Sequence, residues 1–477
     1  MKPAIAENLT QSIQEVFTRQ KSHSVVLRSE PITNRRSRLK NLATWIKANR
    51  KQIQQALYAD FRKPDVETDA TEVLAVLTEI NHALANLERW TKPRKVDAPF
   101  TMLGTRSTIQ YEPKGVCLII SPWNYPFNLS IGPLVAALAA GNSAIIKPSE
   151  LTPNTSAVIS KLCAELFDQS VVTAVEGGVD SSQQLLALPF DHIFFTGSPA
   201  IGKVVMKAAA EHLASVTLEL GGKSPVVVAP STRLREAARR IAVAKFINNG
   251  QTCIAPDYLL VHESVFTSFV NMLKEETVKL FADANGSIEQ SPDYARIVND
   301  KHFNRLNTLI QDAVERGATV VMSGPINASD RFIHPMILTR VPDDARMMDE
   351  EIFGPILPVV PYRSINEAIQ YINQKPKPLA LYIFGADKKE QREVLTRTSA
   401  GGVCINDCAI HYLHSNLPFG GVNNSGIGKS HGHYGFLAFS NEKPVLRQRK
   451  GLTSVQFFYP PYTNRVKKIL DWLIRSL

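Results

Sequence analysis

The sequence lacks the features that mark several classes of protein. Its apolar residues never run unbroken for the roughly 18 positions that a membrane-spanning helix requires. The most apolar region, 117–146, is interrupted by prolines and asparagines and does not suit a simple span. The N-terminus has no apolar core behind its one early lysine, which argues against a signal peptide. No internal repeat or low-complexity tract is visible.

Cysteine is scarce. The five cysteines, which include no CxxC pair, stand at positions 117, 163, 253, 404 and 408. This odd number in 477 residues does not make a disulfide framework, so we expect a reducing, cytoplasmic location. Cys404 and Cys408 lie near His411 and His414, but their spacing does not match a zinc site, and no metal is expected.

The overall composition is that of an ordinary globular protein. Hydrophobic residues make up 44% and charged residues 21%, and 477 residues should divide into two or three domains. The excess of 54 basic over 44 acidic residues is concentrated in 447–477. A basic end can contact nucleic acid, anionic lipid or only solvent. Because no zinc-finger spacing or aromatic RNA-binding motif accompanies it, we do not expect nucleic-acid binding.

The hydrophobic pattern predicts helices first and then alternating strands and helices. Residues 1–90 show helical spacing, and 91–100 is a proline-punctuated connector. From 108 onward, short β-branched runs follow one another, separated in several places by helical stretches: TIQYEP, VCLIIS, SAIIKPS, VVTAVEG, HIFFTGS and SVTLEL. This alternation predicts a parallel sheet covered on both faces. It continues as a second α/β unit over 219–410.

Three residues carry candidate chemistry. Cys253, in GQTCIAP, follows an apolar helical stretch and should lie at its end or in the next turn. A lone cysteine is more often a packing residue, as we assign Cys117 and Cys163. Glu219 ends an apolar strand beside two glycines, where a carboxylate can act as a base or only cap a helix. Asn124, among aromatics and prolines, can donate to an oxyanion or only form a turn.

Two segments suggest a nucleotide. FFTGSPAIG places Gly197 and Gly202 between a strand and a helix, where free N–H groups attract phosphate. It is not the GxGxxG fingerprint and is weak alone. Lys147 and Glu150, in KPSE, follow another strand and can bind ribose hydroxyls or cap the next helix.

Taken together, these segments resemble the aldehyde dehydrogenase superfamily. The resemblance covers about 35–463 and rests on seven segments in the family's order: SPWNYPFN, IIKPSE, FFTGSPAIG, LELGGKSP, GQTCIAP, EEIFGPILPV and LPFGGVNNSGIGKSHG. The short N-terminus and the ending SVQFFYPPYTNR resemble the class 3 branch, which acts on fatty and aromatic aldehydes.

The resemblance implies a role for each matching residue. Cys253 is similar to the catalytic thiol, Glu219 to the general base, and Asn124 with the Cys253 N–H to the oxyanion hole. Residues similar to the family's cofactor contacts are Trp123, Lys147, Glu150, Gly197, Ser198, Gly202, Glu351 and Phe353. Pro199 stands where the family commonly has threonine. Because proline suits the first position of a helix, we expect cofactor binding to survive.

The implied reaction is NAD(P)-dependent oxidation of aldehydes to carboxylic acids through a Cys253 thiohemiacetal and thioester. Glu219 would then activate the hydrolytic water. Glu150 near the ribose favours NAD, with NADP accepted. A semialdehyde or acylating dehydrogenase of the same superfamily is an alternative, although Glu219 fits hydrolysis better. A non-catalytic relative is a further alternative, which the presence of all three catalytic residues argues against.

The implied fold is a Rossmann-like cofactor domain with an α/β catalytic domain and a small β bridging element. We expect the cofactor domain at 1–90 and 112–218 and the catalytic domain at 219–410. The bridging and oligomerisation element should combine 91–111 with 440–452 and mediate a homodimer.

The tail 464–477 predicts an amphipathic helix. Its apolar stripe comprises Val466, Ile469, Leu470, Leu473, Ile474 and Leu477. Such a helix can dock on the protein's own core or on a partner subunit. It can also lie at a membrane surface or gate a tunnel for long-chain or terpenoid-like aldehydes.

Overall fold

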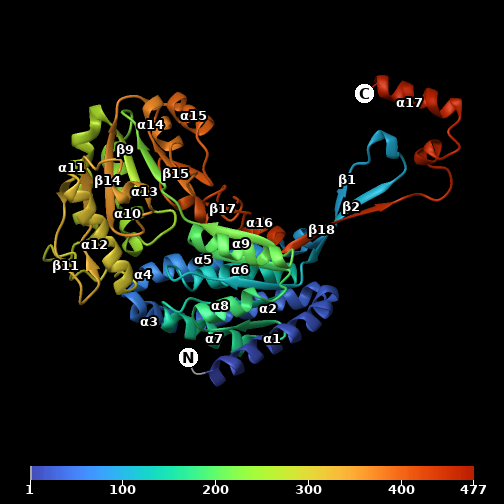
Figure 1. The fold of residues 1–477 in the computed structure, drawn as a ribbon, viewed down its shortest axis with the longest axis horizontal. Coiled ribbons are helices and arrows are strands. Elements are labelled where there is room, and N and C mark those ends of the chain that lie inside the picture. Colours follow the sequence, from blue (N-terminus) through green and yellow to red (C-terminus); the bar gives the residue numbers. More distant parts are fainter. Residues whose placement is uncertain (1–2, 477) are drawn as a thin grey trace.

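The N-terminal region is helical, as predicted. The computed structural model describes residues 3–476. The first helices, coloured blue in Figure 1, are α1 (Pro3–Ser29), α2 (Ile32–Ala48), α3 (Arg50–Phe61), α4 (Asp65–Thr68) and α5 (Leu74–Thr91), with a π-helical turn η1 (Asp69–Val73) before α5. Leu39, Leu42, Ile46 and Ile53, at helical spacing in the sequence, are each 0% exposed. Their burial against the first sheet's core stabilises this helical layer.

The first sheet has six strands. In spatial order they are β17 (Gly426–Ile427), β7 (Ser215–Leu220), β6 (His192–Gly197), β3 (Val116–Ile120), β4 (Ser143–Lys147) and β5 (Val172–Ala174). Its crossover helices are α6 (Asn128–Ala140), α7 (Pro153–Leu166), α8 (Val179–Leu186) and α9 (Pro199–Glu211). All neighbours are parallel except β17, which pairs antiparallel with β7. The strand order reverses between β3 and β6, and such a switch point is where ligands bind in open α/β sheets.

The second sheet has seven strands. In spatial order they are β10 (Thr319–Met322), β13 (Met336–Thr339), β14 (Ile356–Tyr362), β9 (Tyr258–His262), β8 (Pro225–Val228), β15 (Ala380–Phe384) and β16 (Gly402–Ile405). Its helices are α10 (Leu234–Phe246), α11 (Phe266–Phe281), α12 (Asp300–Glu315), α13 (Arg346–Asp349), α14 (Ile365–Asn373) and α15 (Lys388–Arg397). A two-stranded ribbon, β11 (Ile326–Asn327) and β12 (Phe332–Ile333), lies beside it. The central strands β8 and β15 are buried at every position, as expected of parallel strands covered on both faces. The edge strand β10 is antiparallel, which the prediction of a parallel sheet did not include.

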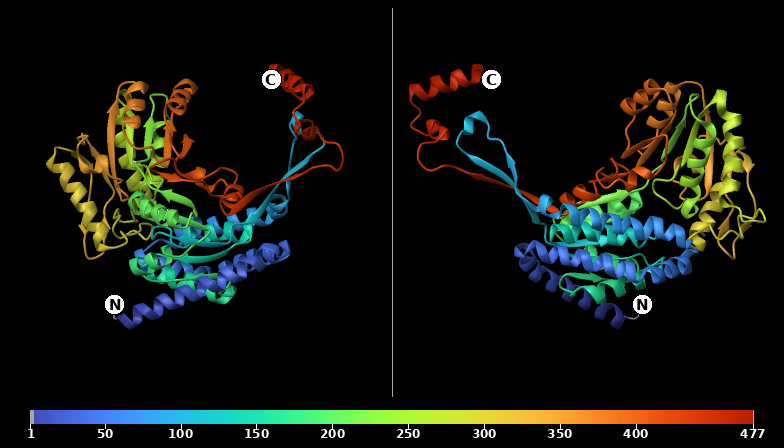
Figure 2. Two further views of the ribbon diagram at one scale, coloured as in Figure 1. Left: turned by 45° about the vertical axis from the view of Figure 1, so that its right-hand side comes forward. Right: turned by 180° about the vertical axis from the view of Figure 1, so that it is seen from behind.

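A third, three-stranded sheet extends away from the two larger ones (Figure 2). It comprises β1 (Arg94–Val96), β2 (Arg106–Pro113) and β18 (Ser440–Arg447), all antiparallel. The run TIQYEP was placed among the parallel strands, which was wrong because it forms most of the antiparallel strand β2; the expected bridging element, 91–111, already included its first four residues. Only Lys114 and Gly115 separate β2 from β3, and a parallel neighbour needs a crossover of about a dozen residues.

Short elements complete the chain. They are η2 (Phe100–Met102), η3 (Ile247–Gly250), η4 (Glu263–Val265), η5 (Ile410–Leu413), α16 (Gly432–Ala438) and η6 (Ser454–Phe458). Of these, α16 packs against α5 and α6, so the chain returns to the first layer after completing the second sheet.

The C-terminal helix α17 (Asn464–Ser476) lies beyond the three-stranded sheet, far from the body of the protein (Figure 1). None of its described residues is buried, so the alternative that it docks on the protein's own core is wrong. Leu470, Trp472 and Ile474 are all exposed. Leu477, the last residue of the predicted stripe, lies outside the described residues. Within residues 3–476, every helix is too short or too polar to cross a bilayer.

Candidate active site

Cys253 lies in the turn that follows α10 and η3, as the sequence predicted. Asn248 and Asn249, both with φ of 54°, and Gly250, with φ of 70°, reverse the chain just before it. A Cβ at Gly250 would lie 2.3 Å from the carbonyl oxygen of Gly354, so only glycine fits there. The thiol is partly buried and packs against the core of the second sheet.

The loop after β3 is joined to this turn by hydrogen bonds. The Asn124 amide donates to the Gln251 carbonyl over 3.0 Å, and the Asn248 amide donates to the Asn124 carbonyl over 2.9 Å. The Tyr125 hydroxyl lies 2.7 Å from Thr252 Oγ1. Asn124 is 3% exposed, and one amide hydrogen remains after its bond to Gln251. This second N–H can serve an oxyanion.

Glu219 is the penultimate residue of β7 and is 5% exposed. Ser430 donates a hydrogen bond to its carboxylate. Burial raises the pKa of Glu219 above its ordinary value, while the charge of His431, the Ser430 hydrogen bond and the charge of Lys429 partly offset that effect. A raised carboxyl pKa moves this group toward the range in which a general base works well.

A second carboxylate, Glu351, lies on the loop before β14. A Cβ at Gly221 would lie 2.1 Å from its Oε2, so the carboxylate rests against the glycines that follow β7. Burial and the charge of Asp257 raise the pKa of Glu351 to about 8. Burial, and then the charges of Glu351 and Glu219, raise the pKa of the Cys253 thiol. The thiol is therefore neutral at physiological pH and needs a base to ionise it.

Aromatic rings form one wall near these carboxylates. The Trp123 ring lies 5.3 Å from that of Phe353 in edge-to-face geometry and 4.8 Å from that of His302. Phe353 has a φ of 52°, which is unusual for a bulky residue and typical of strained functional loops. The wall thus joins the β3 loop of the first sheet to the β14 loop of the second.

The turn between β6 and α9 suits a phosphate group. Ser198 caps α9 by accepting from the Ile201 N–H, and Pro199 occupies the first helical turn. A Cβ at Gly202 would lie 2.7 Å from the side chain of Leu220, so glycine lets α9 lie close to β7. Nearby, the Thr196 hydroxyl is buried without a hydrogen-bond partner among the described residues. The N–H groups at the start of α9 and this Thr196 hydroxyl suit a bound polar group such as the phosphates of a dinucleotide.

Lys147 is the last residue of β4, and Glu150 follows on the next loop, at the same edge of the sheet. The Lys147 ammonium donates to the Pro148 carbonyl over 2.8 Å and lies 3.1 Å from the Glu150 carboxylate. The Lys147 side chain is 3% exposed, whereas that of Glu150 is 45% exposed. The Glu150 carboxylate is therefore accessible to a ligand, whereas the Lys147 ammonium is buried and hydrogen-bonded within the protein.

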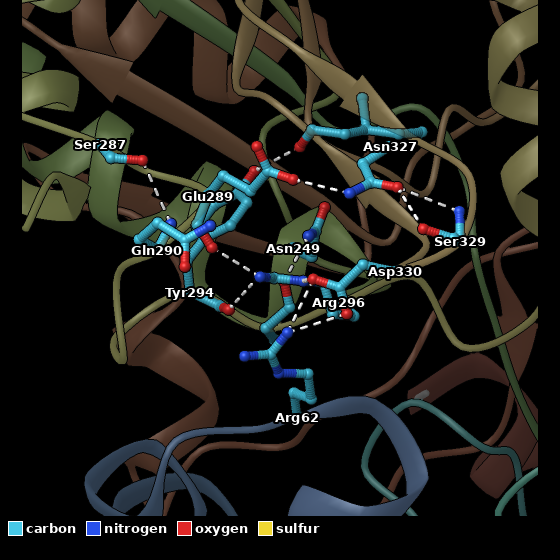
Figure 3. A network of polar contacts seen from close by, with 12 residues as sticks. Arg62, Asn249, Ser287, Glu289, Gln290, Tyr294, Arg296, Asn327, Ser329 and Asp330 are labelled. Atoms are coloured by element: carbon cyan, nitrogen blue, oxygen red, sulfur yellow. Dashed lines mark hydrogen bonds and ion pairs between the residues drawn. The ribbon is translucent and has the colours of Figure 1, made fainter.

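A polar network supports the Cys253 turn from outside the site (Figure 3). The Asp330 carboxylate accepts from Arg62, at the end of α3, and from Arg296, both over 2.7 Å. Asn249 donates to the Ala295 carbonyl over 2.7 Å, and Gln251 to the Arg296 carbonyl over 2.9 Å. The segment around Arg296 thus connects the N-terminal helices to the turn that carries the nucleophile.

Several residues of the site were not predicted. Glu219 lines a small cavity of about 30 Å³ that also contains Glu79, Tyr412, Ser430 and His431. Ser430 and His431 belong to the segment LPFGGVNNSGIGKSHG, but no role was assigned to them. The only sequence feature that pointed to Ser430 and His431 was their position between glycines in this segment. No sequence feature pointed to Glu79, on α5.

The comparisons with known proteins agree on one family. A sequence model described as "Aldehyde dehydrogenase family" matches residues 5–445. The chain is 45% identical over 457 residues to a 4,4'-diaponeurosporen-aldehyde dehydrogenase of Staphylococcus aureus, covering 96% of this chain and 98% of that one. It is 43% identical over 435 residues to aldehyde dehydrogenase family 3 member A2 of Mus musculus, covering 91% and 88%.

Solved structures agree. The structure described as the substrate-bound state of Staphylococcus aureus AldH has a TM-score of 0.92 at 44% identity, covering 97% of this chain and 99% of that one. A Mycobacterium tuberculosis aldehyde dehydrogenase complexed with NAD+ has a TM-score of 0.84 at 26% identity, covering 93% and 91%.

Replacing Asp330 by alanine should destabilise the protein. Arg296 is 1% exposed, and its guanidinium would lose its charged partner inside the structure, as would Arg62 at the surface. We expect the free energy of unfolding to fall by roughly 1–3 kcal/mol, measured by chemical denaturation. Asp344→Ala is the matched control, because its partner Arg316 is exposed and the loss should stay within about 0.5 kcal/mol. Equal losses in both variants would contradict the role of the network.

Proposed function

The chain belongs to the aldehyde dehydrogenase family, and we propose that it oxidises aldehydes to carboxylic acids with Cys253 as its nucleophile. The observation that carries this assignment of residues is the convergence of four side chains from two sheets. Asn124 and Glu219 come from the carboxyl edge of the first sheet, and Cys253 and Glu351 come from loops at the amino edge of the second. No single sheet supplies the nucleophile, the oxyanion donor and the base.

The residues of this chain act in a defined order. Cys253 Sγ bonds to the aldehyde carbon, and Glu219 accepts the thiol proton because both nearby carboxylates disfavour a resting thiolate. The Asn124 amide and the Cys253 N–H stabilise the oxyanion, a contribution of about 10²–10³ in rate for a single such donor. NAD(P), when bound, supplies the hydride acceptor that makes the step an oxidation. The acyl group then remains on Cys253 as a thioester.

Hydrolysis completes the reaction. Water adds to the thioester carbon and gives a proton to Glu219, the carbon–sulfur bond breaks, and the acid leaves with Cys253 restored. A positioned general base contributes roughly 10²–10⁴ to such a step. The cavity beside Glu219 has a volume of about 30 Å³, which is enough to hold a water molecule.

The assignment is tested by steady-state reduction of NAD and NADP with aldehydes of increasing chain length. Cys253→Ala should abolish turnover because no other thiol lies beside Asn124. Glu219→Gln should lower kcat by about 10²–10⁴, because this base acts in both steps; acylation should be slower but still measurable at high pH, where the solvent can ionise the thiol. Cys163→Ala is the control, because this buried thiol on α7 has no contact with the site and its loss should leave kcat unchanged. Persistent turnover in Cys253→Ala would refute the assignment.

For the cofactor, we infer that NAD is preferred and NADP accepted. The exposed Glu150 carboxylate would repel a 2′-phosphate, and the buried Lys147 ammonium beside it weakens that repulsion. Gly197, Ser198 and Gly202 would hold the pyrophosphate at the start of α9, and Trp123, Glu351 and Phe353 would surround the nicotinamide riboside.

Glu150→Ser should therefore raise the ratio of NADP to NAD in kcat/KM by about tenfold. The change removes a negative charge and keeps Lys147 in place. Initial rates at saturating aldehyde measure the ratio, and Glu176→Ser, on the loop after β5, is the control. A wild-type preference for NADP above about tenfold would show that Glu150 does not select the cofactor.

We further propose a homodimer built on the three-stranded sheet. β18 is an edge strand of this sheet, and an unpaired edge is a template for pairing with another chain. The sheet and the following arm stand clear of the body, with Leu446, Leu452 and Tyr462 exposed on them. A two-fold arrangement would cover these apolar groups on both copies at once.

The helix α17 is proposed to serve lipophilic aldehydes, either by gating a substrate tunnel, its own or a partner's, or by peripheral contact with a membrane. Its apolar stripe has no cover within residues 3–476, and Lys467, Lys468 and Arg475 give it a basic face. The long-chain, aromatic or terpenoid-like aldehydes expected from the sequence fit this surface.

Truncation after Tyr462 should raise KM for long-chain aldehydes by about tenfold, the effect of losing roughly two buried methylene contacts, and spare short ones. The measurement is kcat and KM across a series of aliphatic aldehydes, with the molecular mass in solution checked in parallel. Lys468→Ala, which keeps the apolar stripe, is the control. An equal rise of KM for short and long substrates would exclude gating.

A further inference from the structure

A buried histidine–carboxylate pair lies beside the proposed base. His431 Nδ1 is 3.2 Å from Glu79 Oε1, and both side chains are largely buried, 11% and 17% exposed. The other oxygen of Glu79 accepts the Gly432 N–H over 3.0 Å. Glu79, on α5, thus holds two consecutive residues at the start of α16. The pair shares the small cavity with Glu219 and Ser430.

The backbone at His431 is held in an unfavourable conformation. Its φ is 71°, in the left-handed region that favours glycine. Its neighbour Gly432, with φ of 49°, lies so close to the Ser415 carbonyl that a Cβ would come within 2.1 Å. A side chain kept at such a position in a buried site is typical of a functional constraint. The histidine ring is therefore the feature that this turn presents to the cavity.

The charges of the pair act on Glu219. Burial lowers the pKa of His431, but the Glu79 hydrogen bond and the charges of Glu79 and Glu219 outweigh it, so that this pKa is raised. The pKa of Glu79 is lowered, because the contacts with His431 and the Gly432 N–H outweigh its burial. The raised pKa of His431 and the lowered pKa of Glu79 both indicate that the two side chains form an ion pair. Among the groups that offset the burial of Glu219, His431 has the largest effect.

The other titratable groups around His431 do not replace it. His82, on α5, and His411, on η5, both have lowered pKa values through burial, that of His411 to about 4, so both are neutral. The Tyr412 ring lies 4.4 Å from the His431 ring in edge-to-face geometry, and its pKa is raised. Lys429 donates to the carbonyls of Gly401, Gly420 and Gly421, which hold its ammonium in place.

We propose that His431, held by Glu79, is a positioning residue for Glu219: it stabilises the ionised form of this base while the acyl group is hydrolysed. The proposal rests on the proposed function of Glu219. As an imidazolium, His431 opposes the burial that would otherwise protonate Glu219. Ser430 orients the carboxylate through its hydrogen bond, and the His431 imidazolium supplies the positive charge.

The test measures hydrolysis of the acyl-enzyme directly. Single-turnover reactions with NAD and enzyme in excess over aldehyde are acid-quenched, and acylated Cys253 is followed by intact-protein mass. In His431→Gln, loss of the nearby positive charge raises the pKa of Glu219, so hydrolysis needs a higher pH. We expect the acyl-enzyme to form fully and its decay near neutral pH to slow about tenfold, with the pH midpoint moving up by about one unit.

Matched variants separate this effect from a folding defect. Glu79→Gln should move the midpoint in the same direction because His431 loses its counter-ion, and the double variant should be less than additive. His431→Lys keeps the charge and should keep the wild-type midpoint. His433→Gln, the same substitution two residues along α16, should also keep it.

Two outcomes would overturn the proposal. A uniform slowing of decay at every pH with an unchanged midpoint would mean that His431 only packs the turn. A wild-type midpoint in Glu79→Gln would mean that the ion pair does not act on Glu219. Failure of the proposed function itself looks different, since Glu219→Gln would then hydrolyse its acyl-enzyme at the wild-type rate.

Discussion

The site depends on the hydrogen bonds that join the Asn124 loop to the Cys253 turn. One loop follows a strand of the first sheet and the other precedes a strand of the second, so neither sheet alone can hold a nucleophile beside an oxyanion donor. The Asn124 amide and the Asn248 amide bind across this junction in opposite directions, and Tyr125 adds a contact to Thr252. Because these bonds are buried, breaking any of them would leave an unpaired polar group at the reacting centre.

Local patterns predicted what short segments determine by themselves. The turn at Cys253 follows from an apolar helical stretch that ends in two asparagines and a glycine. The buried runs VCLII and PVVV identify central strands because parallel strands are apolar on both faces. The glycine turn before α9 likewise shows its strand–turn–helix form in sequence. The catalytic and cofactor residues were assigned by resemblance to a family, since each motif alone left a structural alternative open.

Contacts between distant segments were beyond such patterns. Glu79 and His431 are 352 positions apart in the sequence, and Arg62 and Asp330 are 268 positions apart. Neither pair has a periodic signal in the sequence. The run TIQYEP has the composition of any strand, and only the short link to β3 reveals that it belongs to the antiparallel sheet. The apolar stripe of α17 has no cover among residues 3–476, and an amphipathic pattern does not identify what would cover it.

The electrostatics of the site form one coupled system. Two carboxylates disfavour ionisation of the Cys253 thiol, and burial disfavours ionisation of the carboxylates, so the charge on any one depends on the others. A protonated thiol is protected from oxidation, since the thiolate is the reactive form. The same arrangement gives Glu219 two tasks, accepting the thiol proton and then the proton of water, and a base that must act twice has to lose its proton in between. The imidazolium of His431, fixed by Glu79, favours that loss because it stabilises the ionised carboxylate in a pocket whose burial otherwise favours the neutral form.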